Sequence, residues 1–206
     1  AHIQEEDAEY ANRKGFSKHD PALPLYTLRD AERAIKLVEV VDFDVWVEVK
    51  RAIRFRFRNA GHIIGSGHVE LELEDRDPPL RVVFSGDIGR YGAPLVQDPS
   101  GPPACDVLVM ESTYGDRDHP ETSVEDQLRD LLRKAVERKS TLLVPAFAVG
   151  RSQQLVYLLK TVMRANPKLS LPIHLDSPMA VHTTEIYQRY PAAHGRADSA
   201  PRPGSG

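Results

Sequence analysis

Residues 59–87 read NAGHIIGSGHVELELEDRDPPLRVVFSGD, and this stretch decides the predicted fold. Apolar and acidic residues alternate from position 69 to position 74, which predicts a strand with a buried apolar side and a charged side in water. The Asp- and Pro-rich residues 75–79 predict a turn, and the more continuously apolar residues 80–84 predict a more buried return strand. The stretch therefore predicts a β-hairpin, with His68 exposed on its charged side.

His62 and Asp87 stand just outside the two strands of this hairpin. The residue before the first strand and the residue after the second lie at the same edge of a sheet, so we expect these two side chains to meet. Imidazole and carboxylate are both zinc ligands, and the neighbouring glycines allow the backbone to fold tightly around an ion. Half of a metal site is therefore one interpretation, and a structural histidine with a turn-forming aspartate is the other.

The composition limits the function classes. The chain has 206 residues, is 41% hydrophobic and carries a net charge of -3, so it can bury one good core or two small ones, and any basic surface for nucleic acid must be local. Its single cysteine excludes an internal disulfide and a Cys-rich zinc module, and is typical of a reducing cytosol, so a cytoplasmic location is predicted. No apolar run is long enough to span a bilayer, and the acidic residues 5–7 do not fit a signal peptide.

The N-terminal residues predict helices. Residues 3–12 are expected to form one or two helical turns, followed by a Pro-containing linker at residues 21–24. Thr27 and Asp30 have the spacing of a capping box, which predicts the start of a second helix.

Two strands are then predicted to lead into the His62 turn. Apolar residues alternate over residues 45–49 and again over residues 53–57. The intervening positions of the second strand carry three arginines: Arg54, Arg56 and Arg58. A solvated strand face is the simplest interpretation of this arginine row, and a row that faces RNA is the alternative.

The residues after the hairpin begin with a Gly- and Pro-rich loop. Residues 106–111 then predict a short buried strand that ends in Glu111. Thr122 and Glu125 predict the capped start of an amphipathic helix.

From residue 141 onward, strands and helices are predicted to alternate. Strands are expected over residues 141–147 and 171–175, with a helix from the Gly-Arg-Ser turn at residues 150–152 between them and a last helix capped at Ser177. This order is typical of a parallel α/β sheet. Residues 191–206 have no periodicity and are interpreted as a disordered or foreign tail.

Four motifs in order give the chain a family resemblance: AGHIIGSGH at residues 60–68, FSGDIGR at 84–90, VMESTYGDR at 109–117 and LLVPAFAVGR at 142–151. Together they resemble the metallo-β-lactamase-fold nucleases of the β-CASP family, which includes RNA 3′-end cleavage endonucleases and bacterial and archaeal RNA-processing relatives. The resemblance covers nearly the whole chain, to about residue 190, but only part of such an enzyme.

The resemblance implies an α/β fold in two parts. Residues 1–115 are expected to form part of a metallo-β-lactamase αββα sandwich, without its N-terminal metal motif. Residues 116–190 are expected to begin the parallel α/β β-CASP domain, with the boundary near residues 112–122.

The resemblance also implies the chemistry of a zinc-dependent ribonuclease. His62 and Asp87 would be metal ligands, Asp87 would bridge two Zn²⁺ ions, and water activated there would attack an RNA phosphodiester. Glu111 would orient a histidine that acts as the general acid and that is not present in this sequence. Softer candidates for binding substrate phosphates have a salt-bridge or helix-cap role as their alternative: Ser66, Arg90, Arg151 and Ser152.

Family residues that this sequence lacks set the limits of the functional prediction. Metallo-β-lactamase-fold hydrolases carry an H-x-H-x-D-H segment ahead of the His62 position, and the sequence contains neither this segment nor the late β-CASP histidines. Because the chain begins at Ala1 rather than Met, further upstream residues are expected in the parent protein. We predict that this chain alone binds zinc weakly and cleaves nothing.

Several readings compete with an RNA nuclease. One is a non-catalytic β-CASP subunit that scaffolds an RNA-processing complex, and another is a DNA-processing relative. A third is an unrelated α/β nucleotide-binding module, suggested by the turn at residues 150–152, although G-x-G-x-x-G and the P-loop lysine are missing. The sequence leaves open endonuclease or exonuclease action, and a homodimer or a subunit of a processing complex.

Overall fold

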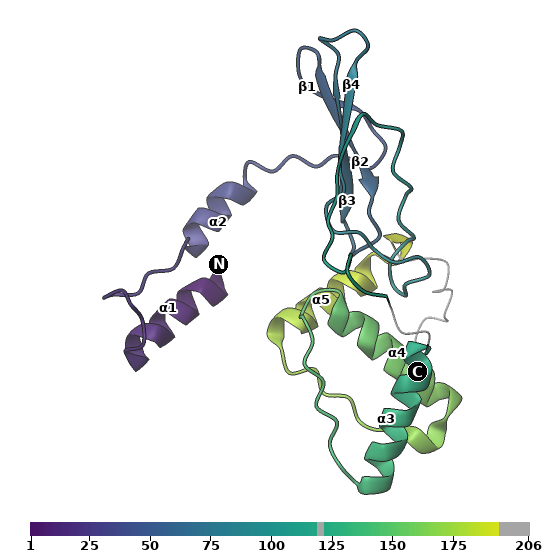
Figure 1. Ribbon diagram of the computed structural model, residues 1–206. Helices are drawn as coiled ribbons and strands as arrows, with labels where there is room; N and C mark the ends of the chain where they lie inside the picture. Colours follow the sequence, from purple (N-terminus) through teal and green to yellow (C-terminus); the bar gives the residue numbers. More distant parts are fainter. Residues whose placement is uncertain (119–121, 194–206) are drawn as a thin grey trace. The chain divides into compact units, whose positions relative to one another are not determined.

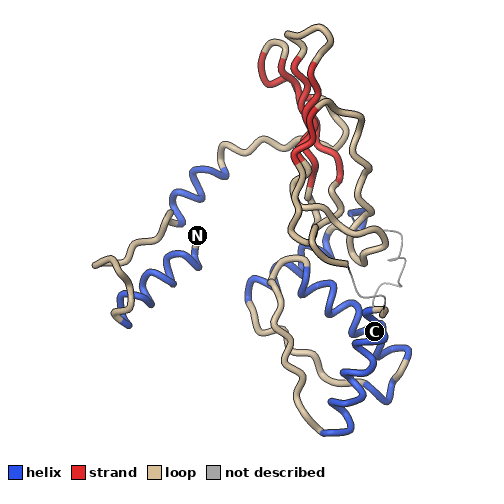
Figure 2. Tube along the Cα trace, viewed as in Figure 1, coloured by secondary structure: helices blue, strands red, loops and turns tan. Residues whose placement is uncertain are grey.

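The computed structural model describes residues 1–118 and 122–193. The chain divides into two compact units, Ala1–Val41 and Asp42–Gly206. Figures 1 and 2 show that the first unit is helical, whereas the second contains a β-sheet and a group of helices. The mixed α/β class predicted from the sequence is confirmed at this coarse level.

The first unit contains helices α1 (His2–Lys14) and α2 (Leu28–Ile35). Helix α1 is longer than the one or two turns predicted, and it ends at Gly15 in the left-handed conformation that glycine adopts without strain. Helix α2 begins with the predicted capping box: Thr27 accepts a hydrogen bond from the Asp30 amide, and the Thr27 amide donates to the Asp30 carboxylate at 3.0 Å. Within this unit the Leu28 amide donates to Glu5 at 3.1 Å and so joins the two helices.

The second unit begins with a five-stranded sheet. Its strands, β1 (Val47–Lys50), β2 (Ile53–Asn59), β3 (Gly67–Leu73), β4 (Leu80–Phe84) and β5 (Val107–Val109), are hydrogen-bonded in the order of the chain. The first four strands pair antiparallel, and β4 and β5 pair parallel. The predicted hairpin is confirmed as β3–β4, with pairs from Val69↔Phe84 to Leu73↔Leu80. Its register places the chain before β3 and the chain after β4 at one edge of the sheet.

The prediction of which hairpin side is buried is wrong. On β3 the charged side is the buried one: Glu70 is 0% exposed and Glu72 is 7% exposed, whereas Val69 and Leu71 are only partly buried. His68 lies on the same side as the glutamates and is also buried, not exposed as predicted. Buried carboxylates cost free energy unless they are paired, so their partners decide this arrangement.

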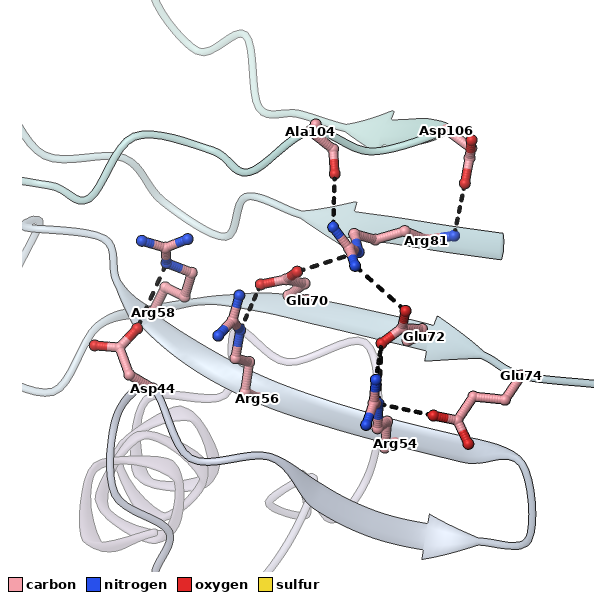
Figure 3. A network of polar contacts seen from close by, with 10 residues as sticks. All are labelled: Asp44, Arg54, Arg56, Arg58, Glu70, Glu72, Glu74, Arg81, Ala104 and Asp106. Atoms are coloured by element: carbon pink, nitrogen blue, oxygen red, sulfur yellow. Dashed lines mark hydrogen bonds and ion pairs between the residues drawn. The ribbon is translucent and has the colours of Figure 1, made fainter. Parts of the chain in front are cut away.

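The arginines of β2 supply these partners (Figure 3). The register sets Arg54 opposite Glu72 and Arg56 opposite Glu70, and the guanidinium groups reach these carboxylates at 2.7 and 2.6 Å. Arg81 of β4 lies 3.4 Å from Glu70 and 3.3 Å from Glu72, so each buried carboxylate contacts two arginines. The hydrogen bond from Arg54 is the main cause that lowers the pKa of Glu72, and Arg81 lowers it further.

The arginine row is therefore a set of partly buried ion pairs rather than a fully solvated face. Arg54 and Arg56 are held by carboxylates on one side and lie over the ring of Trp46 at 4.7 and 4.6 Å. Arg58, the third member, lies 3.5 Å from Asp44. Arg54 and Arg56 thus pair with acids of the sheet, and Arg58 pairs with an acid in the turn before β1.

The helical part consists of α3 (Val124–Arg138), α4 (Arg151–Ala165) and α5 (Pro178–Arg189), with short 3-10 turns at η1 (Pro167–Leu169) and η2 (Pro191–Ala193). Helix α3 begins one residue later than predicted, because Ser123 rather than Thr122 accepts from the Asp126 amide. The predicted cap of α5 is confirmed: Ser177 accepts from the Ala180 amide. The helices enclose a small apolar core formed by Leu128, Leu132 and Val162 with Leu158, Leu159, Met163, Leu169 and Leu171 around it.

The strands predicted over residues 141–147 and 171–175 do not form. Among the described residues from 122 to 193 no strand occurs, and these two segments instead run as coil along a cavity of about 700 Å³ beside α4. A strand exists only through a hydrogen-bonded neighbour, which an apolar run cannot reveal. The prediction of a buried strand before Glu111 is half right: β5 forms, but Val107 and Val109 are 44% and 49% exposed at the edge of the sheet.

Two further predictions concern the C-terminal tail and membrane-spanning segments. Of the predicted tail, residues 194–206 lie outside the described residues, and Pro191–Ala193 forms the turn η2. In the described ranges, no helix combines the length and the apolar character needed to cross a lipid bilayer.

Candidate functional site

The structure brings His62 and Asp87 together at the edge of the sheet. His62 Nε2 lies 3.8 Å from Asp87 Oδ2, and the two side chains are 44% and 75% exposed. Two loops carry them, the first between β2 and β3 and the second after β4. The pair is accessible to solvent and to a ligand.

The His62 loop is shaped by Ser66. The Ser66 hydroxyl oxygen accepts from the amides of His62 at 3.0 Å and Ile63 at 3.3 Å, and the Ser66 carbonyl accepts from the Ala60 amide at 3.1 Å. These bonds hold the residues around His62 in a tight turn. Ser66, a candidate for binding substrate phosphate, therefore has an observed role in building the turn.

The Asp87 loop is pressed directly against the His62 loop. The Gly89 amide donates to the Ala60 carbonyl at 2.8 Å. A Cβ atom added at Gly89 would lie only 1.8 Å from the Gly61 carbonyl oxygen, so the two backbones approach as closely as a residue without a side chain allows. This contact fixes the spacing of the two loops and, with it, the spacing of His62 and Asp87.

Glu111 follows β5 and joins the same cluster. One carboxylate oxygen accepts from the Ile88 amide at 2.6 Å, and the other accepts from the Thr113 hydroxyl at 2.6 Å. The Ile88 bond, then the Thr113 bond and in smaller part the charge of His62, lower the pKa of Glu111. The carboxylate that was expected to orient a catalytic histidine thus holds the loop of Asp87 in the described structure.

The remaining predicted site residues differ in their positions. Arg90 and Arg151 are exposed. Ser152 is only 7% exposed, and its hydroxyl donates to the Phe147 carbonyl at 2.7 Å. The N-cap role considered for Ser152 is wrong, because α4 is capped by Gly150 at φ 77° and Ser152 lies in the first turn.

Sequence reasoning missed the contact between the start of α4 and the His62 loop. A Cβ atom added at Gly150 would lie 2.7 Å from Ile63 Cγ2, so the helix start is in close contact with this loop. Tyr187 of α5 is buried, which raises the pKa of its hydroxyl, and the nearby backbone of Ile64 offsets part of this rise. The Gly150 contact places the start of α4, where Arg151 is the first residue, beside the His62 loop. The positive φ of Gly150 was not readable from the sequence.

The donor chemistry of the pair fits a zinc ion in part. Zinc ligands lie about 2.0–2.2 Å from the ion, so two of them can be at most about 4.3 Å apart. The His62–Asp87 separation of 3.8 Å is within this limit. Across residues 1–118 and 122–193, however, no group of three or more His, Cys, Asp or Glu side chains is placed to hold a metal ion. The pair therefore fits as part of a metal site.

Comparison with known proteins adds a domain match and several relatives. The family model of the Beta-Casp domain matches residues 152–203, a range that reaches into the predicted tail. The chain is 34% identical over 167 residues to Ribonuclease TTHA0252 of Thermus thermophilus, covering 81% of this chain and 37% of the relative. It is 34% identical over 156 residues to Endoribonuclease YSH1 of Mycosarcoma maydis, covering 74% and 17%. It is 32% identical over 172 residues to Transcription termination factor FttA of Pyrococcus horikoshii, covering 82% and 26%.

An α/β chain with these motifs and this domain match belongs to the β-CASP family of metallo-β-lactamase-fold proteins, as the motifs predicted. Its relatives are named as a ribonuclease, an endoribonuclease and a transcription termination factor. The chain spans well under half the length of these relatives. The Beta-Casp match begins at Ser152, in the helix after the Gly-Arg-Ser turn, and so argues against a separate nucleotide-binding module there.

Proposed function

We propose that this chain is part of a zinc-dependent β-CASP nuclease that cleaves phosphodiester bonds in RNA. The observation that carries the proposal is the 3.8 Å approach of His62 Nε2 to Asp87 Oδ2 between two interlocked loops. Relatives whose names are ribonuclease and endoribonuclease support the reaction class and the substrate. A cytoplasmic location is proposed from the single cysteine.

His62 and Asp87 are the proposed metal ligands, and further donors complete the site in the whole protein. Zinc at such a site activates water and neutralises charge on the reacting phosphate. Asp87, whose side chain is 75% exposed, would hold zinc together with His62. Glu111 keeps its carboxylate on the Ile88 amide and so holds the Asp87 loop in place while RNA binds.

RNA is proposed to bind through local positive charge at the site. The chain as a whole is slightly acidic, with a net charge of -3. Arg54 and Arg56 of β2 are already paired with acids, so they do not form a broad basic surface. Arg90 follows the Asp87 loop and Arg151 starts the helix that contacts the His62 loop. These two exposed arginines are the proposed contacts to backbone phosphates.

We propose that the sheet is one half of a metallo-β-lactamase sandwich. The side opposite the charged network carries a row of apolar residues in register across four strands: Phe55, Leu71, Val82 and Val107. None of the four is buried. A sheet face of this kind is covered by a second layer in a stable domain, which we assign to a part of the whole protein. The proposed boundary to the β-CASP domain stays near residues 112–122.

A non-catalytic scaffold subunit is the second candidate function. The observation that favours it is the small donor set, since only His62 and Asp87 meet among the described residues. Such a subunit would keep the fold and the RNA-processing partners without cleaving RNA.

The reading frame upstream of Ala1 separates these two candidates. If it encodes H-x-H-x-D-H, the whole protein is expected to retain zinc after dialysis and to cleave labelled RNA, while the 206-residue chain does neither. Asp87→Ala should abolish cleavage and lower the zinc content, and Asp75→Ala, in the exposed β3–β4 turn, should leave both unchanged. A whole protein without zinc or cleavage would favour the scaffold function. Equal cleavage of DNA would shift the proposal to a DNA-processing relative.

A further inference from the structure

We propose that His68 is a positioning residue that fixes the turn of Ser85, Gly86 and Asp87 through a hydrogen bond to the Ser85 carbonyl. The inference rests on the proposed metal role of Asp87, but the geometry behind it does not depend on metal or RNA. His68 is the last residue of the motif at residues 60–68 but has no role assigned above, and sequence reasoning expected it to be exposed.

His68 reaches across the end of the hairpin. The last pair of the β3–β4 ladder is Val69↔Phe84, so His68 and Ser85 face each other one position further on. His68 is 4% exposed, and its Nδ1 lies 2.5 Å from the Ser85 carbonyl oxygen. A carbonyl oxygen can only accept, so the bonding partner assigns the proton to Nδ1.

Ser85 is held at every polar group. Its amide donates to the Val109 carbonyl at 2.9 Å, and its hydroxyl donates to the Gly86 carbonyl at 2.7 Å and accepts from the Glu111 amide at 3.1 Å. Its carbonyl receives the His68 bond. Because Ser85 is only 4% exposed, loss of that donor would leave a buried carbonyl without its partner.

The orientation of this peptide group determines where the chain leaves toward Asp87. Gly86 follows with φ 56°, and a Cβ atom added there would lie 3.2 Å from the Gly67 carbonyl, so the turn passes close to the start of β3. Rotation of the Ser85–Gly86 peptide would swing Asp87 away from His62 Nε2, which lies 3.8 Å away. His68 and Glu111 thus hold the Asp87 turn from both ends, before and after the carboxylate.

The alternative is that His68 only fills space on the buried face of β3. The other two buried residues of that face, Glu70 and Glu72, pair with arginine side chains, whereas His68 bonds to backbone. A space-filling residue would tolerate any side chain of similar size. A positioning residue requires a donor at the Nδ1 position.

Asparagine and glutamine variants separate these roles, because the asparagine amide nitrogen can occupy the position of Nδ1 and the longer glutamine places its amide further out. We would measure amide hydrogen exchange by NMR in the full 206-residue chain, following the Ile88 and Glu111 amides, which bond on either side of Asp87. His68→Asn should keep both exchange rates near those of the wild type. His68→Gln and His68→Leu should raise both exchange rates about tenfold. Amides near the Ile53↔Leu73 pair, at the far end of the β2–β3 ladder, should exchange as in the wild type.

Equal protection of the two amides in His68→Gln and in the wild type would overturn the inference. So would an equal loss in His68→Asn, because that result would assign His68 a packing role. If His68→Leu unfolds as a whole, the comparison of asparagine with glutamine still decides. In the wild type, the ¹⁵N spectrum of the His68 ring should also show the proton on Nδ1. Absence of nuclease activity would change none of these readings, so failure of the proposed function is distinguishable from failure of this inference.

Discussion

Replacing Gly89 by alanine is expected to open the candidate site by forcing its two loops apart. The new Cβ atom would lie 1.8 Å from the Gly61 carbonyl oxygen, and side chains essentially never approach such an atom within 3.0 Å, so the loops must separate by at least 1.2 Å. The obstacle is backbone, which cannot rotate away as a side chain can. Such a shift would disturb the 3.8 Å separation of His62 and Asp87, which is within about 0.5 Å of the upper limit of about 4.3 Å for two ligands of one zinc ion.

The expected free-energy cost has two parts. Overpacking of a tight site costs about 1–3 kcal/mol. Loss of the hydrogen bond from the Gly89 amide to the Ala60 carbonyl adds about 0.5–1.5 kcal/mol. We therefore expect Gly89→Ala to lower the free energy of unfolding by about 1.5–4.5 kcal/mol, measured by urea denaturation of the full chain.

Two glycines of the same loop region provide matched controls. Gly101 has open space around its Cβ position, so Gly101→Ala should change stability by no more than about 0.5 kcal/mol. Gly92 also has open space but adopts φ 68°, so Gly92→Ala should cost about 1 kcal/mol from backbone strain alone. A loss for Gly89→Ala no larger than that for Gly101→Ala would refute the close approach of the two loops.

Two further predictions concern the charged network. The pKa of Glu72 is lowered in the folded state, so the ionised carboxylate stabilises the fold above the ordinary glutamate pKa of 4.5, and this stabilisation is lost as the pH falls through the folded pKa. Urea denaturation between pH 3 and pH 7 should show the loss of stability at low pH. In Glu72→Gln this pH dependence should be smaller. Glu70→Gln removes the charge that pairs with two arginines at a fully buried position and should cost about 3–5 kcal/mol, whereas Glu74→Gln, at 43% side-chain exposure, should cost less than about 1 kcal/mol. Similar losses in both variants at neutral pH would contradict the burial of Glu70.

Local patterns predicted the parts of the fold that depend on near neighbours. The capping box of Thr27 and Asp30 depends on residues three positions apart, and the β3–β4 hairpin depends on two strands joined by one turn. Both were predicted. The meeting of His62 and Asp87 followed from the hairpin geometry alone. The hidden approach of Gly89 to Gly61 did not, because nothing in either glycine marks its partner.

The burial of the hairpin was predicted wrongly because each strand was judged separately. The acidic residues of β3 look solvent-facing until the arginines of β2 are set opposite them, where both are satisfied in pairs. The alternating arginines were the signal that could have corrected this. The strands expected over residues 141–147 and 171–175 failed for a related reason, since strand formation depends on distant partners that no local pattern identifies.

The charged network also fixes the alignment of the strands, and so acts on the candidate site from a distance. A slip of one residue between neighbouring strands would turn each arginine or carboxylate toward the opposite side and leave it unpaired. A slip of two residues would keep the sides but move β4 by about 7 Å along β3, since each residue of an antiparallel strand advances about 3.4 Å. That shift exceeds the 3.8 Å between His62 and Asp87. Arg81, which bonds to Glu72 far along the hairpin, therefore sets the distance between two side chains that it never touches.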